Sequence, residues 1–284
     1  MPELPEVEVL MRHLAPLLVG QRVRAVEVQR AKIVQPSSVE AFASALRGAR
    51  FSGLRRRGKY LVFTLRARGS RQAFDVLGHL GMTGRMYLQP AGAPLPKHAA
   101  VALDLGRSRF VFEDTRYFGR LTLDLTPLAA LGPEPLDGEF TAETLRRALA
   151  RSRQAIKVKL LDQGVVAGVG NIYASEALFR AGLSPRRAAC RLKPAQCARL
   201  CAAIREVLAE AIRFGSTVPL NWEGGAGGDG LFYYGRAEDA ADYYDERLDV
   251  YDRAGQPCRR CGANVRRLVQ AARSTYYCPG CQYG

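Results

Sequence analysis

The first eight residues, Met1-Pro-Glu-Leu-Pro-Glu-Val-Glu8, place a proline and a carboxylate where they could do chemistry. A residue as small as Pro2 normally permits removal of the initiator methionine, which leaves a free secondary amine. Such an amine attacks the aldehyde carbon of a sugar to form a covalent iminium, dividing one difficult cleavage into two easier steps. Glu3 is then placed to move protons as a general acid or base. The same residues also suit a helix start, because proline fits the first turn and carboxylates complement the helix dipole.

Four cysteines near the end of the sequence have the spacing of a metal site. Cys258 and Cys261 form one CxxC pair, Cys278 and Cys281 form another, and sixteen residues separate the pairs. Two such pairs predict a tetrahedral zinc ion with four thiolate ligands. Because four thiolates leave no position for water or substrate, we expect one structural Zn²⁺ rather than a catalytic metal.

The stretch between these pairs, residues 263–277, is expected to form a β-hairpin that the metal holds in place. It carries Arg266, Arg267 and Arg273. Arginines on a rigid hairpin predict a grip for the phosphates of a nucleic acid. The alternative is a zinc ribbon that serves only stability, with its arginines solvated.

Apolar spacing predicts the elements that hold these groups. Between Pro5 and Leu18 apolar residues recur every three or four positions, which predicts a helix that ends at Gly20. Residues 21–124 consist of short alternating or apolar runs broken by glycine and basic residues, which predicts a β-sandwich or barrel. The apolar helix positions are Leu4, Val7, Leu10, Leu14 and Leu17, and the expected strands are Arg22–Val28, Tyr60–Leu65, Ala99–Leu105, Phe110–Phe112 and Leu121–Leu125.

Proline and glycine cluster in residues 126–135, which predicts a linker, and the pattern beyond it becomes helical. Residues 215–244 show no hydrophobic period and are expected to form a loop. The fold class is therefore α+β, with domains at 1–130, 131–245 and 246–284. The expected helices are Thr141–Ala150, Gln154–Leu161, Ser175–Ala181 and Pro194–Phe214, and the first of them begins with a cap region at Thr141–Thr144.

The charge of the chain indicates its partner. There are 42 lysines and arginines against 27 acidic residues, a net charge of +15 with a pI near 9.9. Such a field concentrates polyanions, so nucleic acid is the first partner class and an anionic membrane surface the second. No apolar run approaches the roughly 20 residues that span a bilayer, and the acidic start is unlike a signal peptide. We expect a cytoplasmic protein in which Cys190, Cys197 and Cys201 are unpaired thiols, the last two in a helix core.

Four motifs resemble, in order and spacing, those of bacterial formamidopyrimidine-DNA glycosylases. They are Met1–Glu8, Gly78-His-Leu-Gly-Met-Thr-Gly84, Gly168-Val-Gly-Asn-Ile-Tyr-Ala-Ser-Glu176 and the four-cysteine finger. The resemblance implies an N-terminal β-sandwich with an N-terminal helix, a helix-two-turns-helix domain and a C-terminal zinc finger. It implies a base-excision-repair enzyme that excises oxidised purines, such as 8-oxoguanine and formamidopyrimidines, from damaged double-stranded DNA and nicks the abasic strand by β,δ-elimination. We expect it to be a monomer associated with the nucleoid.

The resemblance also assigns roles residue by residue. Pro2 matches the nucleophile that forms the imine, and Glu3 matches the catalytic carboxylate. Lys59 matches a strand lysine that contacts phosphate and assists catalysis, although the sequence around it otherwise indicates a solvated basic run. Asn171 would otherwise be a turn or cap residue and His98 a structural histidine. The matched DNA contacts are His98, Arg116, Lys157, Asn171 and Arg273, the last also counted as catalytic.

Met82, Arg116 and Phe118 match three residues that the family inserts into the duplex. A flipped base leaves a hole in the stack, and apolar or planar groups that refill it offset part of the unstacking cost. In isolation Met82 and Phe118 would be assigned to a core, although the neighbouring Gly119 favours an exposed turn for Phe118.

Two departures from the family pattern affect the expected specificity. Tyr117 stands where many relatives carry a second arginine. Pro219 stands in the lesion-capping loop, residues 215–245, where the family offers backbone amides that proline lacks. An endonuclease VIII-type enzyme for oxidised pyrimidines therefore stays open as an alternative. A non-catalytic, zinc-stabilised DNA-binding protein is another, against which the pairing of Pro2 with Glu3 argues.

Overall fold

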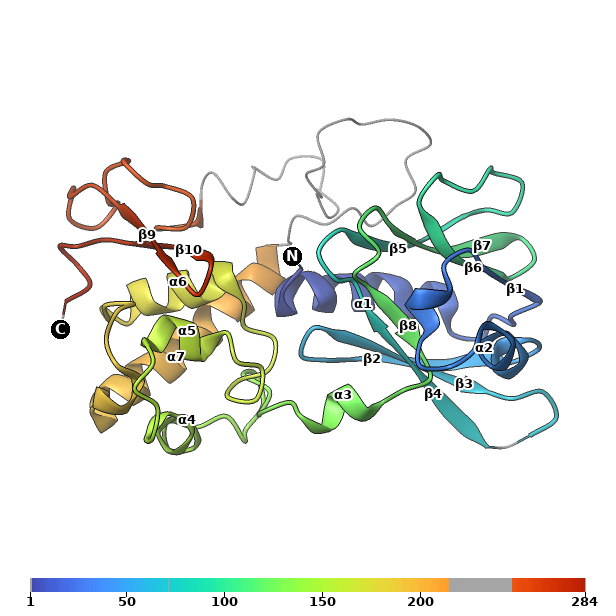
Figure 1. The fold of residues 1–284 in the computed structure, drawn as a ribbon, viewed down its shortest axis with the longest axis horizontal. Coiled ribbons are helices and arrows are strands. Elements are labelled where there is room, and N and C mark those ends of the chain that lie inside the picture. Colours follow the sequence, from blue (N-terminus) through green and yellow to red (C-terminus); the bar gives the residue numbers. More distant parts are fainter. Residues whose placement is uncertain (1, 71, 215–246, 284) are drawn as a thin grey trace. The chain divides into compact units, whose positions relative to one another are not determined.

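The computed structural model describes residues 2–70, 72–214 and 247–283 (Figure 1). These residues divide into two units, and the chain passes from the first to the second after Ala129. This point lies within the stretch rich in proline and glycine that was predicted as a linker. The expected loop at residues 215–245, with Pro219, lies outside the described residues.

The first unit is a β-sandwich of two antiparallel sheets, which confirms the predicted fold of this part. One sheet has the strand order β2-β3-β4-β8 and the other the order β1-β6-β7-β5. The short helices η1 and α2 connect β1 to β2, and α3 follows β8. Helix α1 packs against β2 and β3. The bounds are α1 Leu4–Leu18, β1 Ala25–Val28, η1 Ala31–Val34, α2 Val39–Leu46, β2 Arg50–Arg57, β3 Tyr60–Arg66, β4 Ala73–His79, β5 Gly84–Pro90, β6 Ala99–Asp104, β7 Ser108–Asp114, β8 Arg120–Thr122 and α3 Thr126–Ala129.

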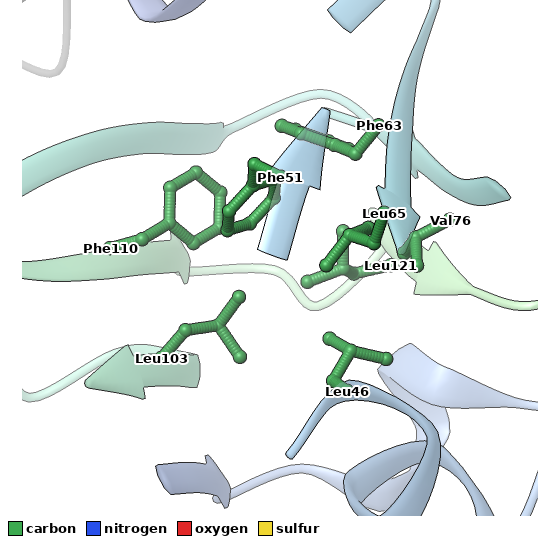
Figure 2. Close-up of a pocket in the computed structure, with 8 residues that line it drawn as sticks. All are labelled: Leu46, Phe51, Phe63, Leu65, Val76, Leu103, Phe110 and Leu121. Atoms are coloured by element: carbon green, nitrogen blue, oxygen red, sulfur yellow. The ribbon is translucent and has the colours of Figure 1, made fainter. Parts of the chain in front are cut away.

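The core of this unit lies between the two sheets. Phe63 of β3 and Phe110 of β7 meet edge to face across it, with ring centres 5.7 Å apart. Figure 2 shows these rings beside a cavity of about 10 Å³ whose eight lining side chains are all apolar. A cavity without polar partners does not retain water. The cavity is therefore a gap in core packing rather than a ligand site.

Helix α1 buries the predicted face with one exception. Leu4, Val7, Leu10 and Leu14 are buried, but Leu17 is 42% exposed and Leu18 is buried in its place. The prediction for Leu17 was wrong because the helical angle per residue brings position 18 nearer to the centre of the buried face. The helix ends as predicted, with Val19 as its C-cap and Gly20 at a φ of 90°.

Strands β2, β4 and β5 were not predicted from the sequence. The first part of the basic run, Arg55–Arg57, lies in β2, where Arg55 is exposed. This strand lies at one end of its sheet. An edge strand has one flank open to solvent, and charged side chains are tolerated there.

The second unit combines helices with a C-terminal hairpin. Helices α4 and α6 pack on the long helix α7, and α6 also contacts β10. Thr141 caps α4 as predicted, with its hydroxyl accepting a hydrogen bond from the backbone N–H of Thr144 at 3.1 Å. The predicted core thiols of Cys197 and Cys201 are buried. The bounds are α4 Ala142–Leu149, α5 Ile156–Leu160, α6 Asn171–Arg180, η2 Ala189–Arg191, α7 Pro194–Phe214, β9 Arg266–Gln270 and β10 Arg273–Tyr277.

Among the helices that the structure describes, none is long and apolar enough to cross a membrane.

Candidate functional site

Pro2 and Glu3 lie immediately before helix α1. Pro2 is half-buried, and Glu3 is 2% exposed at the N-cap position. The backbone N–H of Glu3 donates to Oε2 of Glu6 at 2.6 Å, and Pro5 lies in the first turn. The interpretation as a helix start is thus confirmed, while the catalytic roles stay a prediction. The two are compatible, because the positive end of the helix dipole disfavours the protonated form of an amine at residue 2 and so favours its nucleophilic form.

Glu8 joins this helix to the turn that carries Lys59. Arg56 donates through Nε to Oε2 of Glu8 at 2.7 Å and through Nη1 to the carbonyl of Gly58 at 3.2 Å. Burial raises the pKa of Glu8, but hydrogen bonds and charge from Arg56 and Arg12 outweigh it and lower the pKa. Gly58, at a φ of 56°, and Lys59 form the two-residue turn between β2 and β3, a position that favours glycine. Lys59 is only 6% exposed, so the fold holds it and the solvated interpretation was wrong.

His79 lies next to Lys59 and was given no role from the sequence. Its ring stands 4.8 Å from that of Tyr60, its partner across β3 and β4, and its Nδ1 accepts the backbone N–H of Gly81 at 3.1 Å. Burial, and then the charges of Lys59 and Arg120, lower the pKa of His79 to about 4. The ring is therefore neutral at pH 7. Because Nδ1 is an acceptor, the hydrogen lies on Nε2.

This pKa predicts how stability depends on pH. A histidine with an unfolded pKa of 6.5 and a folded pKa of about 4 contributes stability that is fully present above pH 6.5. That contribution is lost as pH falls from 6.5 towards 4, because only the unfolded chain takes up the proton. The loss should reach up to about 3 kcal/mol. Urea denaturation at pH 7.5 and pH 4.5 measures it: His79→Gln should lose less stability than the wild type on acidification, and His98→Gln should match the wild type.

The three residues predicted to enter the duplex lie on two loops of the sandwich. Met82 is half-buried in the turn between β4 and β5, and Arg116 and Phe118 lie in the loop between β7 and β8. Phe118 is 49% exposed, so it belongs to an exposed turn, and the guanidinium of Arg116 lies 4.8 Å from the centre of its ring. Nearby, Nδ1 of His98 lies 3.4 Å from the hydroxyl of Tyr117.

In the second unit, the structure brings Lys157, Asn171 and the hairpin together. Nζ of Lys157 is buried and donates to Oδ1 of Asn171 at 2.5 Å and to the hydroxyl of Thr275 at 3.3 Å. Nδ2 of Asn171 donates to the carbonyl of Ser274 at 2.9 Å, beside the exposed Arg273. Asn171 begins helix α6, whose N-terminus favours anions. Lys157 thus holds Asn171 in this arrangement, and its phosphate contact stays a prediction.

Glu176 fixes the segment that leads into the finger. Its Oε2 accepts the backbone N–H of Asp249 at 2.8 Å, and its Oε1 accepts those of Val250 at 3.0 Å and Tyr251 at 2.8 Å. Burial raises the pKa of Glu176 to about 7, against the effect of these three hydrogen bonds. The same contacts place the Tyr251 hydroxyl 3.5 Å from Nδ2 of Asn171.

The four predicted zinc ligands lie together. The sulfur atoms of Cys258, Cys261, Cys278 and Cys281 all lie within 4.8 Å of one another, and two of the separations are 3.9 and 3.4 Å. Sulfurs placed tetrahedrally about 2.3 Å from a zinc ion are roughly 3.8 Å apart. The backbone N–H of Cys278 also donates to Oε1 of Gln282 at 2.8 Å, which orients this ligand. The residues fit one structural zinc ion, as predicted.

Comparison with known proteins matches this chain over almost its whole length. Residues 1–121 match the family model for the formamidopyrimidine-DNA glycosylase N-terminal domain, residues 131–220 that for its H2TH domain, and residues 255–282 that for a zinc finger found in FPG and IleRS. The chain belongs to the formamidopyrimidine-DNA glycosylase family. The formamidopyrimidine-DNA glycosylase of Dechloromonas aromatica is 42% identical to this glycosylase, with all of both chains covered.

Solved structures of the Lactococcus lactis enzyme have the same fold. A mutant in complex with DNA containing Fapy-dG has a TM-score of 0.86 and 31% identity to this glycosylase, with all of both chains covered. The wild-type enzyme in complex with DNA containing an oxidised pyrimidine gives the same TM-score, identity and coverage. Membership of this family makes the chain a base-excision-repair glycosylase and argues against a non-catalytic DNA-binding protein.

Three residues that organise these two units of the glycosylase were missed from the sequence, although they lie in the motifs that carried the resemblance. Glu8 belongs to the first motif, His79 to the second and Glu176 to the third, and each connects residues far apart in the chain. One signal could have found these residues: each is a charged or titratable side chain within a motif whose other residues are mostly apolar or glycine.

Proposed function

We propose that this glycosylase excises oxidised purines from damaged double-stranded DNA and then cleaves the abasic strand, with Pro2 as its nucleophile. The observation that carries the proposal is the position of Pro2 before the buried Glu3, on a helix that Glu8 and Arg56 join to the turn with Lys59. Catalytic groups act well when the fold holds them in place before substrate arrives. Here one ion pair fixes the helix and the turn relative to each other.

In the proposed reaction, the amine of Pro2 bonds to C1′ of the damaged nucleotide as the bond from C1′ to the base breaks. Glu3 moves the protons that departure of the base and opening of the sugar require. The resulting iminium withdraws electrons and acidifies the C2′ hydrogen, and its loss as a proton expels the phosphate at C3′. Loss of a second proton from C4′, acidified through the new C2′–C3′ double bond, then expels the phosphate at C5′. Lys59, beside a neutral His79, adds a cation for the phosphate of this nucleotide.

The proposed grip on the DNA backbone lies in the second unit. Arg273 is exposed at the start of β10, and Asn171 is held beside the same strand by Lys157 and the carbonyl of Ser274. A helix N-terminus, an amide and a guanidinium together suit one or two phosphates. Zinc supplies no step of the reaction: when bound, it stabilises the finger that presents Arg273.

The choice of base is the finer part of the proposal. Oxidised purines are favoured by the name of the family and by the three residues Met82, Arg116 and Phe118. The Lactococcus lactis enzyme has also been crystallised on DNA with an oxidised pyrimidine, so that class stays an alternative. The segment expected to cap the base, residues 215–245, lies outside the described residues. A monomeric, nucleoid-associated protein with domains at 1–130, 131–245 and 246–284 completes the proposal.

Borohydride reduction tests the nucleophile and the lesion class together. The protein is incubated with duplexes that carry 8-oxoguanine, a formamidopyrimidine, an oxidised pyrimidine or no damage, and the iminium is trapped. We expect adducts with the two purine lesions, mapped by mass spectrometry to Pro2 of a chain that lacks Met1. An adduct on Lys59 would overturn the assignment of the nucleophile, and a stronger signal from the pyrimidine duplex would favour the alternative substrate.

A further inference from the structure

The two loops that carry Met82, Arg116 and Phe118 meet at a single buried carboxylate. Asp114, the last residue of β7, is fully buried. Its Oδ1 accepts the hydroxyl hydrogen of Thr83 at 2.6 Å, which ties it to the turn that carries Met82. The side chain of Asp114, at the start of one loop, therefore contacts the other loop directly.

The carboxylate also brackets the loop that carries Arg116 and Phe118. Oδ1 of Asp114 accepts the backbone N–H of Arg116 at 3.1 Å, and Oδ2 accepts that of Gly119 at 2.8 Å. Tyr117, between these two bonds, has a φ of 51°, an unfavourable value for an aromatic residue. Such backbone strain persists only where the surrounding structure holds it. The two hydrogen bonds of Asp114 are the restraint on either side of it.

The backbones of the two loops pack so closely that neither Gly81 nor Gly119 has room for a side chain. A side chain on Gly81 would meet the backbone of Gly119 at 2.6 Å, and one on Gly119 would meet the ring of Phe112 at 2.4 Å and the carbonyl of His79 at 2.8 Å. The loops are therefore pressed against each other as well as bonded. Any change in the position of one is transmitted to the other.

We infer that Asp114 is a positioning residue that sets the spacing between Met82 and the pair Arg116 and Phe118. The inference rests on the proposed function, in which these three side chains refill the stack. Phe118 is half-exposed, so packing alone does not fix where it points. Asp114 supplies a restraint shared by the two loops, because its two oxygens accept three hydrogen bonds, one from the turn of Met82 and two from the loop of Arg116 and Phe118. The three side chains then enter the duplex as one unit, without an ordering step.

Asp114→Asn tests this inference, because the amide replaces one acceptor oxygen with an NH₂ group that faces backbone or hydroxyl donors. Extrusion of a base requires the stack to be refilled, whereas a preformed abasic site has no base to extrude. We therefore expect kcat/KM for excision of 8-oxoguanine to fall by about 10- to 100-fold, while nicking of a preformed abasic site changes by less than about 3-fold. A 2-aminopurine beside the lesion should show a weaker rise in fluorescence on binding, which reports insertion directly.

Two further variants separate positioning from loss of folding. Thr83→Val removes only the hydrogen bond between Asp114 and the turn that carries Met82. It should show the same selective loss of excision and of 2-aminopurine fluorescence, but a smaller loss than Asp114→Asn. Asp75→Asn is the matched control, since Asp75 on β4 also accepts two side-chain hydrogen bonds, from Thr64 and Arg55, away from both loops. It should behave as the wild type.

The outcomes against the inference are specific. Wild-type excision and fluorescence in both Asp114→Asn and Thr83→Val would overturn it. If Asp114→Asn does not fold, Thr83→Val decides: selective loss supports the inference and unchanged excision refutes it. Failure of the wild type to excise any lesion or to nick the abasic duplex would instead contradict the proposed function.

Discussion

Glu3→Gln should lower the rate of base excision by about 10²- to 10⁴-fold, the range for loss of a general acid or base. Departure of the base needs proton transfer, and a glutamine amide cannot supply it. Nicking of a preformed abasic site should fall less, because its sugar aldehyde already accepts attack by Pro2. Single-turnover rates on duplexes with 8-oxoguanine and with an abasic site measure the two effects.

The structural role of Glu3 is small by comparison. As the N-cap of α1 it contributes about 0.5–2 kcal/mol, which lowers the melting temperature but leaves the chain folded at 25 °C. Glu40→Gln is the matched control, since Glu40 lies exposed in the first turn of α2 and should excise as the wild type does. No loss of either activity would show that Glu3 only starts the helix.

Cys278→Ser should remove the zinc ion and with it the ordered finger. Cys278 is fully buried in a small apolar cluster that includes Val250, Val265 and Tyr276. Zinc contributes about 10–16 kcal/mol to the folding of such small domains, far more than this cluster alone. The zinc content measured by metal analysis should fall from about one ion per chain to a small fraction of that. Affinity for damaged duplex should fall at least about tenfold, because each charge-assisted hydrogen bond to a phosphate contributes about 1.5–3 kcal/mol.

The control for this prediction is another cysteine of the same unit. Cys190 is exposed and lies outside the metal cluster, so Cys190→Ser should keep both its zinc and its DNA affinity. Circular dichroism should retain the helical signal in Cys278→Ser, because α4, α6 and α7 pack on one another without the finger. Normal DNA binding by a zinc-free variant would contradict the role of the metal in presenting Arg273.

Features with a local cause could be predicted from the sequence. Two CxxC pairs identify a zinc site because the ligand geometry is set by a few covalent bonds within each pair. The apolar period of α1, the cap at Thr141 and the end at Gly20 were predicted for the same reason, since the forces act over one or two helical turns. The first residues indicated both a helix start and amine chemistry; the structure confirms the helix start, and the catalytic roles that the family resemblance assigns to Pro2 and Glu3 stay a prediction.

The tertiary structure decided what depends on contacts between distant residues. Lys157 was assigned only as a DNA contact, but the structure buries its ammonium group, which donates to Asn171 and Thr275. The arginine-rich strand β2 was missed because the carboxylate that pairs with Arg56 belongs to Glu8, which lies far from this strand in the chain. Asp114 bonds locally to Arg116 and Gly119, but its contact with the turn of Met82 is not local. The link between the two loops arises because strand register brings Gly84 opposite Asp114, which places Thr83, 31 residues away in sequence, within reach of the carboxylate.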